Sequence, residues 1–179
     1  KGDLLERVYI DRRGAEFSGF TTRQNVETET RMLRIEADGR GGLAPIASPL
    51  AAAKAVANAA VQAERAGFGW NPDQRSATQK LLNSCNRITA LQGYAGTAKT
   101  TTVLATFACE AAARGVSITA LAPTASAAMV LGQALGTNGN TVARHLLSPQ
   151  RGDIGRPAAW IVDEASLLSA HDMARLFEL

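Results

Sequence analysis

The stretch of sequence with the clearest chemical potential lies between positions 93 and 100. It reads Gly93-Tyr94-Ala95-Gly96-Thr97-Ala98-Lys99-Thr100. This spacing matches a phosphate-binding loop, G-x-x-x-x-G-K-S/T, whose backbone N–H groups and following helix N-terminus point at phosphate oxygens. In such a loop, we expect Lys99 to meet the β- and γ-phosphates and the Thr100 hydroxyl to hold Mg²⁺. We therefore expect ATP and Mg²⁺ as cofactors, and the nucleotide-binding residues include Gly93, Gly96, Thr97, Ala98, Lys99, Thr100 and Thr101.

One position of the loop departs from the pattern, because Ala98 stands where the second glycine is expected. That glycine commonly has a positive φ and lets the backbone approach the phosphates, so a methyl group there costs about 1 kcal/mol of strain. A chance glycine- and threonine-rich turn could produce the same spacing. The apolar run before the loop and the helical pattern after it favour the phosphate loop instead.

An acidic pair, Asp163-Glu164, follows the apolar run Trp160-Ile161-Val162. We expect Asp163 to join Thr100 in the Mg²⁺ shell, and Glu164 to orient and deprotonate an attacking water, so the catalytic candidates are Lys99, Asp163 and Glu164. Taken alone, such a pair is more often an ordinary helix N-terminus. The phosphate loop upstream reverses that preference.

The elements that must position these residues follow an alternating pattern. Strands are expected at 88–91, 116–121 and 160–162, and helices at 98–113, 125–135 and from about 171. Continuous apolar strands that alternate with helices predict an α/β fold, a parallel sheet with helices on both faces, as in P-loop NTPases. We expect the strand at 160–162 to lie beside the strand at 88–91, so that the acidic pair meets the loop at the carboxyl edge of the sheet.

The preceding residues predict a smaller unit. Two strands joined by a turn at 11–14 predict a β-hairpin, and a helix follows from Thr22 and ends at Gly39 to Gly42. An alanine-rich helix runs from Ser48-Pro49 to Gly67, and another begins at Asn71-Pro72 and ends before Arg87. We expect residues 1–70 to form a small N-terminal hairpin and helical region, and residues 71–179 to form the nucleotide-binding domain.

Composition bounds the class of protein. With 179 residues, 46% hydrophobic and 20% charged, the chain is typical of a globular domain, which excludes disordered and disulfide-rich classes. The lack of an apolar run of roughly 18 residues predicts no membrane insertion and a cytoplasmic location. A net charge of +3 leaves nucleic acid open as a partner. Cys85 and Cys109 lack partners at metal-ligand spacing, so we expect buried thiols.

Five motifs, in order, resemble the early motifs of RecD-like superfamily 1B DNA helicases. The resemblance is closest to the helicase region of conjugative relaxases of the TraI/TrwC type, and the segments at Lys1-Gly2-Asp3-Leu4-Leu5 and Phe20-Thr21-Thr22 extend it over nearly the whole chain. The motifs are Gln74-Arg75-Ser76-Ala77, the run from Gln92 to Thr101, the run from Ala122 to Ala128, the run from Thr141 to Leu146, and Val162-Asp163-Glu164-Ala165-Ser166.

This resemblance implies a first RecA-like domain of an ATP-dependent DNA helicase that acts on single-stranded DNA in plasmid transfer. It implies that Gln74 recognises adenine, although a lone glutamine there is more often a solvated residue in the first turn of a helix. It also implies that Pro123, Thr124 and Thr141 contact phosphates of the DNA strand. The family often has a glycine and a basic residue at the positions of Ala125 and Ser126, so contact through side-chain charge is weakened here.

Four further residues admit two interpretations each. Arg144 and His145 could touch DNA, or could be a solvated arginine and a packed histidine. Phe68 and Trp70 could stack on bases, although core packing or a hydrophobic staple is the favoured interpretation.

Other functions keep the same fold. A vestigial helicase domain that binds single-stranded DNA or serves in secretion recognition is favoured by Ala98, and a RecD-like exonuclease V repair helicase retains the same chemistry. Conjugation or secretion machinery is a further expected partner. The chain begins at Lys1 and ends at Leu179, so we expect a piece of a longer protein that lacks the second RecA-like domain. Such a piece is expected to hydrolyse ATP and unwind DNA poorly or not at all.

Overall fold

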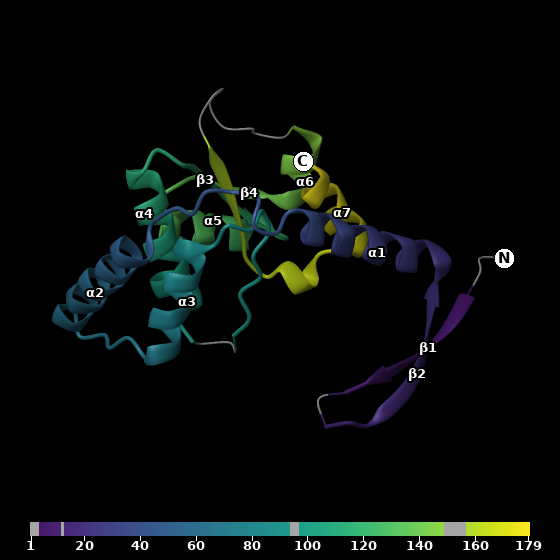
Figure 1. Ribbon diagram of the computed structural model, residues 1–179. Helices are drawn as coiled ribbons and strands as arrows, with labels where there is room; N and C mark the ends of the chain where they lie inside the picture. The colour runs from purple at the N-terminus through teal and green to yellow at the C-terminus, as the bar shows by residue number, and fades with distance from the viewer. Residues whose placement is uncertain (1–3, 12, 94–96, 149–156) are drawn as a thin grey trace.

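The computed structural model describes residues 4–11, 13–93, 97–148 and 157–179, which form an N-terminal arm and an α/β body (Figure 1). The arm comprises β1 (Leu4–Ile10), β2 (Glu16–Thr22) and α1 (Arg23–Asp38). The body comprises α2 (Pro49–Arg65), α3 (Pro72–Asn83), the π-helix η1 (Lys99–Leu104), α4 (Ala105–Ala113), β3 (Ser117–Ala122), α5 (Ala125–Leu135), β4 (Gly139–Thr141), α6 (Val142–Leu147), β5 (Ala158–Val162), the 3₁₀ helix η2 (Ala165–Leu167) and α7 (Ala170–Glu178).

The expected hairpin is confirmed. β1 and β2 pair antiparallel, from Leu4 opposite Thr22 to Ile10 opposite Glu16. In the turn, the carboxylate of Asp11 accepts hydrogen bonds from two main-chain N–H groups, at 2.7 and 2.9 Å. A carboxylate that satisfies turn N–H groups in this way is a common reason for aspartate at such a position.

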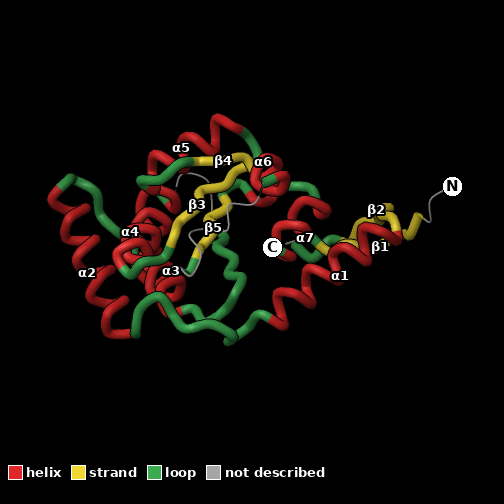
Figure 2. The backbone as a smooth tube through the Cα atoms, turned by 90° about the horizontal axis from the view of Figure 1, so that it is seen from above, coloured by secondary structure: helices red, strands yellow, loops and turns green. Residues whose placement is uncertain are grey.

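Helix α1 joins the hairpin to the body. It begins where the Thr22 hydroxyl accepts a hydrogen bond from the Asn25 N–H, and it ends at Gly39, as expected. The helix runs alongside α7 in both views (Figures 1 and 2), and Arg31 forms an ion pair with Glu178 of α7 at 3.0 Å. None of its residues is fully buried, so the arm is held to the body by partly exposed contacts.

The alanine-rich helix α2 packs on α3 and α4 through its smallest side chains. The Ser48 hydroxyl caps its N-terminus and Pro49 occupies the first turn, as expected. Trp70 is buried against Val56 and Ala60, which confirms core packing for this aromatic residue. Phe68 remains exposed.

The sheet has the order β4-β3-β5 and is parallel throughout. Its register places Ala122 beside Thr141 and Leu121 beside Val162, so the carboxyl ends of the three strands lie at one edge. Leu121 is buried among residues of α6 and α7, while α4 and α5 also contact β3. The expected α/β fold, with a parallel sheet flanked by helices, is confirmed.

Several expected elements are corrected. Residues 88–91 form no strand: β5 lies at the edge of the sheet and pairs with β3 on one side, and no described backbone ladder joins this segment to its other side. The expected pairing of the strands at 160–162 and 88–91 is therefore wrong. The helix expected at 98–113 begins at Lys99 with a π-helical segment.

Two short elements, β4 and α6, were not expected, since three and six residues carry little periodicity. Cys109 is exposed and Cys85 is half-buried, so the expectation of buried thiols is wrong. The reason at Cys109 is its position, because α4 buries Ala108 and Ala111 instead.

Strand β4 lies very close to α5. A Cβ atom built on Gly139 would collide with the main-chain carbonyl of Ala128, and one built on Gly132 would collide with the backbone of Gly139. The close approach therefore requires glycine at both positions.

No described helix is long and apolar enough to cross a membrane.

Candidate nucleotide and magnesium site

The described part of the candidate phosphate loop consists of Gly93 and the residues from Thr97 onward; the candidate Gly96 lies outside the described residues. Ala98 has φ 53° and ψ 27°, the left-handed conformation expected for the residue at this position. The helical segment begins at the next residue, Lys99. The chain thus takes the required turn with an alanine, at the strain that a Cβ atom brings to this conformation.

The lysine of the loop lies back across its first glycine. Lys99 Nζ donates a hydrogen bond to the Gly93 carbonyl at 2.7 Å. A Cβ atom on Gly93 would stand 3.0 Å from Cδ of Lys99, so glycine leaves room for the lysine side chain. A carbonyl and a phosphate oxygen are both acceptors for an ammonium group, so the same Nζ can exchange one for the other.

The Thr100 hydroxyl donates a hydrogen bond to Asp163 Oδ2 at 3.0 Å, across 63 positions of sequence. Both side chains are half-buried. Hydroxyl and carboxylate oxygens are the ligands that Mg²⁺ uses in proteins, usually one or two carboxylates with waters and substrate phosphates. The pair therefore fits a magnesium site directly beside the phosphate loop.

The backbone of β5 delivers the acidic pair to this place. The Asp163 N–H donates to the Leu121 carbonyl at 3.0 Å, which extends the parallel ladder by one residue. Glu164 then has φ 51°, and its N–H donates to Asp163 Oδ1 at 2.9 Å. Among the described non-glycine residues, only Ala98 and Glu164 have positive φ, and both belong to this site. Backbone strain of this kind clusters at functional sites.

Gln74 connects the start of α3 to the loop. Its Oε1 accepts a hydrogen bond from the Asn71 N–H at 2.9 Å, and its Nε2 donates to the Thr97 carbonyl at 2.9 Å. Asn71 returns the capping bond, accepting from the Gln74 N–H at 2.8 Å. A glutamine amide has two donors and two acceptor positions, so each end retains one for a ligand.

Two threonines around the loop bind the carbonyl of Ala98. Thr102 Oγ1 donates to it at 2.6 Å, and the exposed Thr101 Oγ1 lies 3.5 Å from it. The sequence motif indicates Thr101 as a nucleotide-binding residue but does not indicate Thr102. The run of three threonines was the available signal, but only the structure shows which hydroxyl reaches the strained residue.

The candidate DNA-binding residues lie at the same carboxyl edge of the sheet. The Thr124 hydroxyl caps α5 by accepting from the Ala127 N–H, and the Thr141 hydroxyl caps α6 by accepting from the Arg144 N–H, each at 3.2 Å. Pro123 connects β3 to Thr124. Helix capping alone accounts for threonine at both positions, while each hydroxyl proton can still donate to a phosphate oxygen.

His145 is packed in the interior. Its ring meets the Trp160 ring edge-on at 4.8 Å, and neither of its nitrogens has a hydrogen-bond partner among the described residues. Burial lowers the pKa of the His145 imidazole below its usual value. A packed histidine, and not a DNA contact, is therefore confirmed, whereas the neighbouring Arg144 is exposed.

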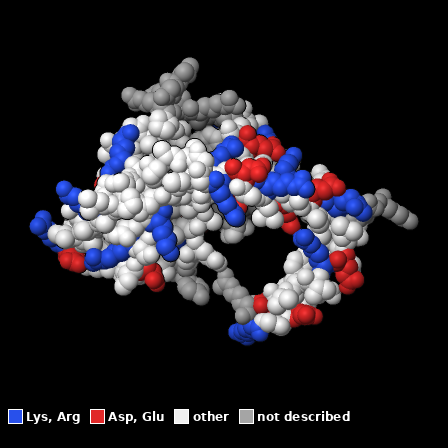
Figure 3. All heavy atoms as spheres, in the orientation of Figure 1, with Lys and Arg blue, Asp and Glu red and all other residues white. Residues whose placement is uncertain are grey.

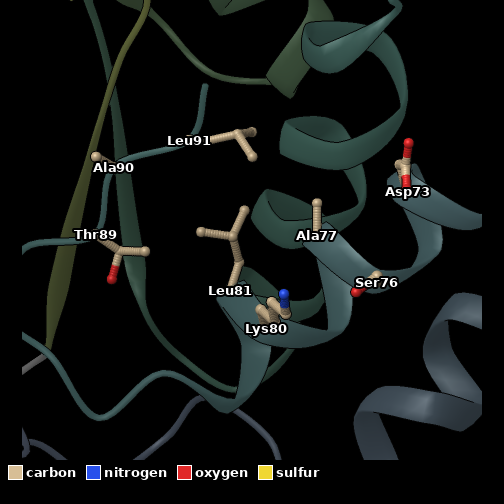
Figure 4. Close-up of a pocket in the computed structure, with 8 residues that line it drawn as sticks. All are labelled: Asp73, Ser76, Ala77, Lys80, Leu81, Thr89, Ala90 and Leu91. Carbon is tan, nitrogen blue, oxygen red and sulfur yellow. The ribbon is translucent and has the colours of Figure 1, made fainter. Parts of the chain in front are cut away.

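A separate cavity of about 340 Å³ lies between α3 and the segment 89–91 (Figure 4). Its lining includes Ala77 and Leu81 of α3, with Asp73 and Lys80 as charged side chains. None of the described phosphate-loop residues lines it. The cavity is thus distinct from the contact between Thr100 and Asp163.

Comparison with known proteins agrees with this geometry. Residues 69–179 match the model of a family described as an AAA domain. No curated protein sequence matches the chain. The match spans well over half of the chain and includes the loop, the acidic pair and Gln74, so the chain belongs to the AAA domain family, a P-loop NTPase family that includes superfamily 1 helicases such as RecD.

Proposed function

We propose that this chain is the nucleotide-binding core of a superfamily 1 DNA helicase, in which ATP hydrolysis drives movement along single-stranded DNA. The observation that carries the proposal is the hydrogen bond between Thr100 and Asp163, next to Lys99. It joins the end of β5 to the phosphate loop, which is the arrangement that phosphoryl transfer in P-loop enzymes requires.

Each residue of the site has a proposed role. Lys99 leaves the Gly93 carbonyl and binds the β- and γ-phosphates, and Thr100 and Asp163 hold Mg²⁺. Bound Mg²⁺ neutralises charge that develops on the phosphates. Glu164 orients the attacking water and accepts its proton. Gln74 uses its remaining donor and acceptor to bind adenine.

Single-stranded DNA is the proposed second ligand. Pro123, Thr124 and Thr141 lie at the edge that carries Asp163, so a strand bound there would lie close to the nucleotide. Lysine and arginine are interspersed with acidic residues over the face seen in Figure 3. With a net charge of only +3, we expect weak, salt-sensitive binding with little sequence preference.

The finer assignment is the helicase part of a conjugative relaxase, with conjugation or secretion machinery as partner. The sequence resemblance to TraI/TrwC-type proteins supports it, and an exonuclease V repair helicase is the alternative with the same chemistry. A vestigial module that only binds DNA is favoured by the methyl group of Ala98. Against that module, Ala98 keeps the left-handed turn, and Lys99, Thr100 and Asp163 keep their places around it.

Calorimetric titration with Mg-ADP and Mg-ATP tests the nucleotide site. We expect weak binding that Lys99→Ala removes, because the ammonium group that meets the phosphates is lost. Lys80→Ala, which removes an exposed lysine of α3, is the matched control and should bind normally. Equal binding by the wild type and Lys99→Ala contradicts the proposed site.

Hydrolysis is tested separately. Glu164→Gln should keep nucleotide binding but lose any turnover stimulated by single-stranded DNA, because the group that accepts the proton of water is gone. A chain that binds Mg-ATP and DNA, yet shows the same residual ATPase with and without Glu164, supports the DNA-binding module instead of the motor.

A further inference from the structure

The hairpin of the N-terminal arm exposes an apolar face. Register places β1 residues of even number on one side, together with their partners on β2. Four large side chains on this side are 65% to 74% exposed: Leu4, Val8, Ile10 and Phe20. We call this side, with Glu6, Glu16, Ser18 and Thr22, the outer face of the hairpin.

The body does not cover the outer face. Arg7, which lies on the opposite side of β1, forms an ion pair with Glu29 of α1 at 2.9 Å, so at this position the opposite side is the one turned to α1. Farther along that side, Phe17 and Tyr9 stack on each other and are 54% and 37% exposed. A two-stranded sheet with an open apolar face is marginally stable in water, and exposed apolar patches mark sites of association.

The charge of the outer face indicates what can cover it. It carries two acidic residues, Glu6 and Glu16, and no basic residue. Neither carboxylate forms an ion pair within the described part of the chain. Acidic side chains repel phosphates, so the outer face is not expected to bind DNA. Its charges complement those of an apolar surface that carries two cations.

The chain itself has such a surface on α2. Helical spacing aligns five exposed residues along one stripe, which we call the α2 stripe: Leu50, Lys54, Ala57, Val61 and Arg65. Leu50 is 82% exposed and Val61 is 46% exposed. Neither Lys54 nor Arg65 forms an ion pair with another described residue.

The spacing of charges agrees between the two surfaces. Lys54 and Arg65 are eleven residues apart on a helix, about 16 Å at 1.5 Å per residue. Glu16 lies opposite Ile10, which is four residues from Glu6 along β1. Four residues along one strand and one step to the neighbouring strand separate Glu6 from Glu16 by about 14 Å. Long lysine and arginine side chains easily absorb the difference.

We propose that the outer face of the hairpin binds the α2 stripe of a second copy of this chain. The two surfaces lie at opposite ends of the molecule in both views (Figures 1 and 2), so one copy cannot join its own. The contact is therefore heterologous and leaves a free surface at each end, which produces open head-to-tail chains or a ring. This association is independent of nucleotide binding.

Sedimentation velocity measures the association directly. The weight-average mass should rise with concentration from the micromolar to the near-millimolar range, without a plateau at the dimer, and fall towards the monomer at about 0.5 M salt. Two charge-reversed proteins, the hairpin variant (Glu6→Lys with Glu16→Lys) and the α2 variant (Lys54→Glu with Arg65→Glu), should each be monomeric. Glu27→Lys and Arg34→Glu, exposed on α1, are the matched controls and should associate normally.

Mixing the two variants gives the decisive result. The unchanged hairpin of the α2 variant fits the unchanged α2 stripe of the hairpin variant, and the two reversed surfaces fit each other, so an equimolar mixture should recover the concentration-dependent assembly that neither variant shows alone. A protein that carries all four reversals should recover concentration-dependent assembly. Circular dichroism checks that each variant is folded. A wild type that is monomeric at every concentration, association that either variant retains, or a mixture that stays monomeric overturns the proposal.

Discussion

Thr100, the last residue of the phosphate loop, and Asp163, the residue that follows β5, are joined by a hydrogen bond of 3.0 Å between the hydroxyl and the carboxylate. If the pair holds Mg²⁺, then Asp163→Asn should abolish most of the gain in ADP affinity that Mg²⁺ provides. The loss in metal affinity should be at least about 10-fold, because changing a residue that only supports a metal ligand already costs that much. Titrations with Mg²⁺ and with a chelator measure that gain. Thr100→Ser keeps the hydroxyl and should behave as the wild type; a Mg²⁺ effect that is unchanged in Asp163→Asn would contradict the site.

Ala98 provides a test of whether the loop is impaired. Ala98→Gly removes about 1 kcal/mol of left-handed strain from the folded chain, which raises stability. It also increases the conformational entropy of the unfolded chain, which lowers stability by a similar amount. We therefore expect the free energy of unfolding to change by less than about 1 kcal/mol, and any ATPase to stay within about tenfold. Ala98→Val should lower stability by more, because a β-branched residue rarely adopts φ near 53°.

Denaturant unfolding and ATPase assays check these two variants. An increase in turnover of several orders of magnitude in Ala98→Gly would show that the methyl group disables the wild-type loop. That result would favour the DNA-binding module over the helicase motor.

Local patterns predicted the elements that depend on local signals. The bounds of α5 agree with the expected helix at 125–135 because Thr124 caps its start and Gly136 ends it in the left-handed conformation. The segment 88–91 failed as a strand because a ladder depends on which distant segment lies alongside, and apolar composition carries no such information.

The same division holds within the site. Loop spacing identified Lys99 and Thr100, and an apolar run identified Asp163, but their mutual contacts depend on the sheet register. The bond from the Gln74 amide to the Thr97 carbonyl spans 23 positions and has no sequence signature apart from the glutamine itself. Tertiary contact, and not propensity, determines which of several polar groups face each other.

Thr141 offers a way to separate capping from DNA contact. Aspartate caps helices at least as well as threonine, so Thr141→Asp should retain the free energy of unfolding. Its negative charge would repel a phosphate, so affinity for a labelled oligothymidine should fall, as measured by fluorescence anisotropy. Thr141→Ser is the control for both measurements. If Thr141→Asp binds the oligonucleotide as tightly as the wild type does, the threonine serves only as a cap.

Gly139 should tolerate no side chain. Gly139→Ala places a Cβ atom against the Ala128 carbonyl, which forces β4 away from α5 and should cost at least 1 to 3 kcal/mol, a typical range for overpacking. Gly69→Ala, where a Cβ atom meets nothing within 4 Å, is the control and should be neutral or slightly stabilising. Chemical unfolding of both variants measures the difference, and equal stabilities would contradict the close packing of β4 on α5.

Acid should destabilise the body through His145. Its buried ring has a pKa below the usual value near 6.5, so between the two pKa values the unfolded chain binds more protons than the folded chain. The contribution of His145 to stability is therefore complete above pH 6.5 and falls as the pH drops below it. Thermal unfolding at pH 7.5 and pH 5 should show a lower midpoint in acid.

His145→Leu should reduce this difference, since leucine does not titrate in the core formed by α6, α7 and Trp160. His171, the other histidine of the chain, is exposed, and His171→Gln should leave the difference unchanged. The linkage requires a histidine whose pKa changes on unfolding. If His145→Leu keeps the difference between pH 7.5 and pH 5 and His171→Gln loses it, protonation of the buried ring is not what lowers stability in acid.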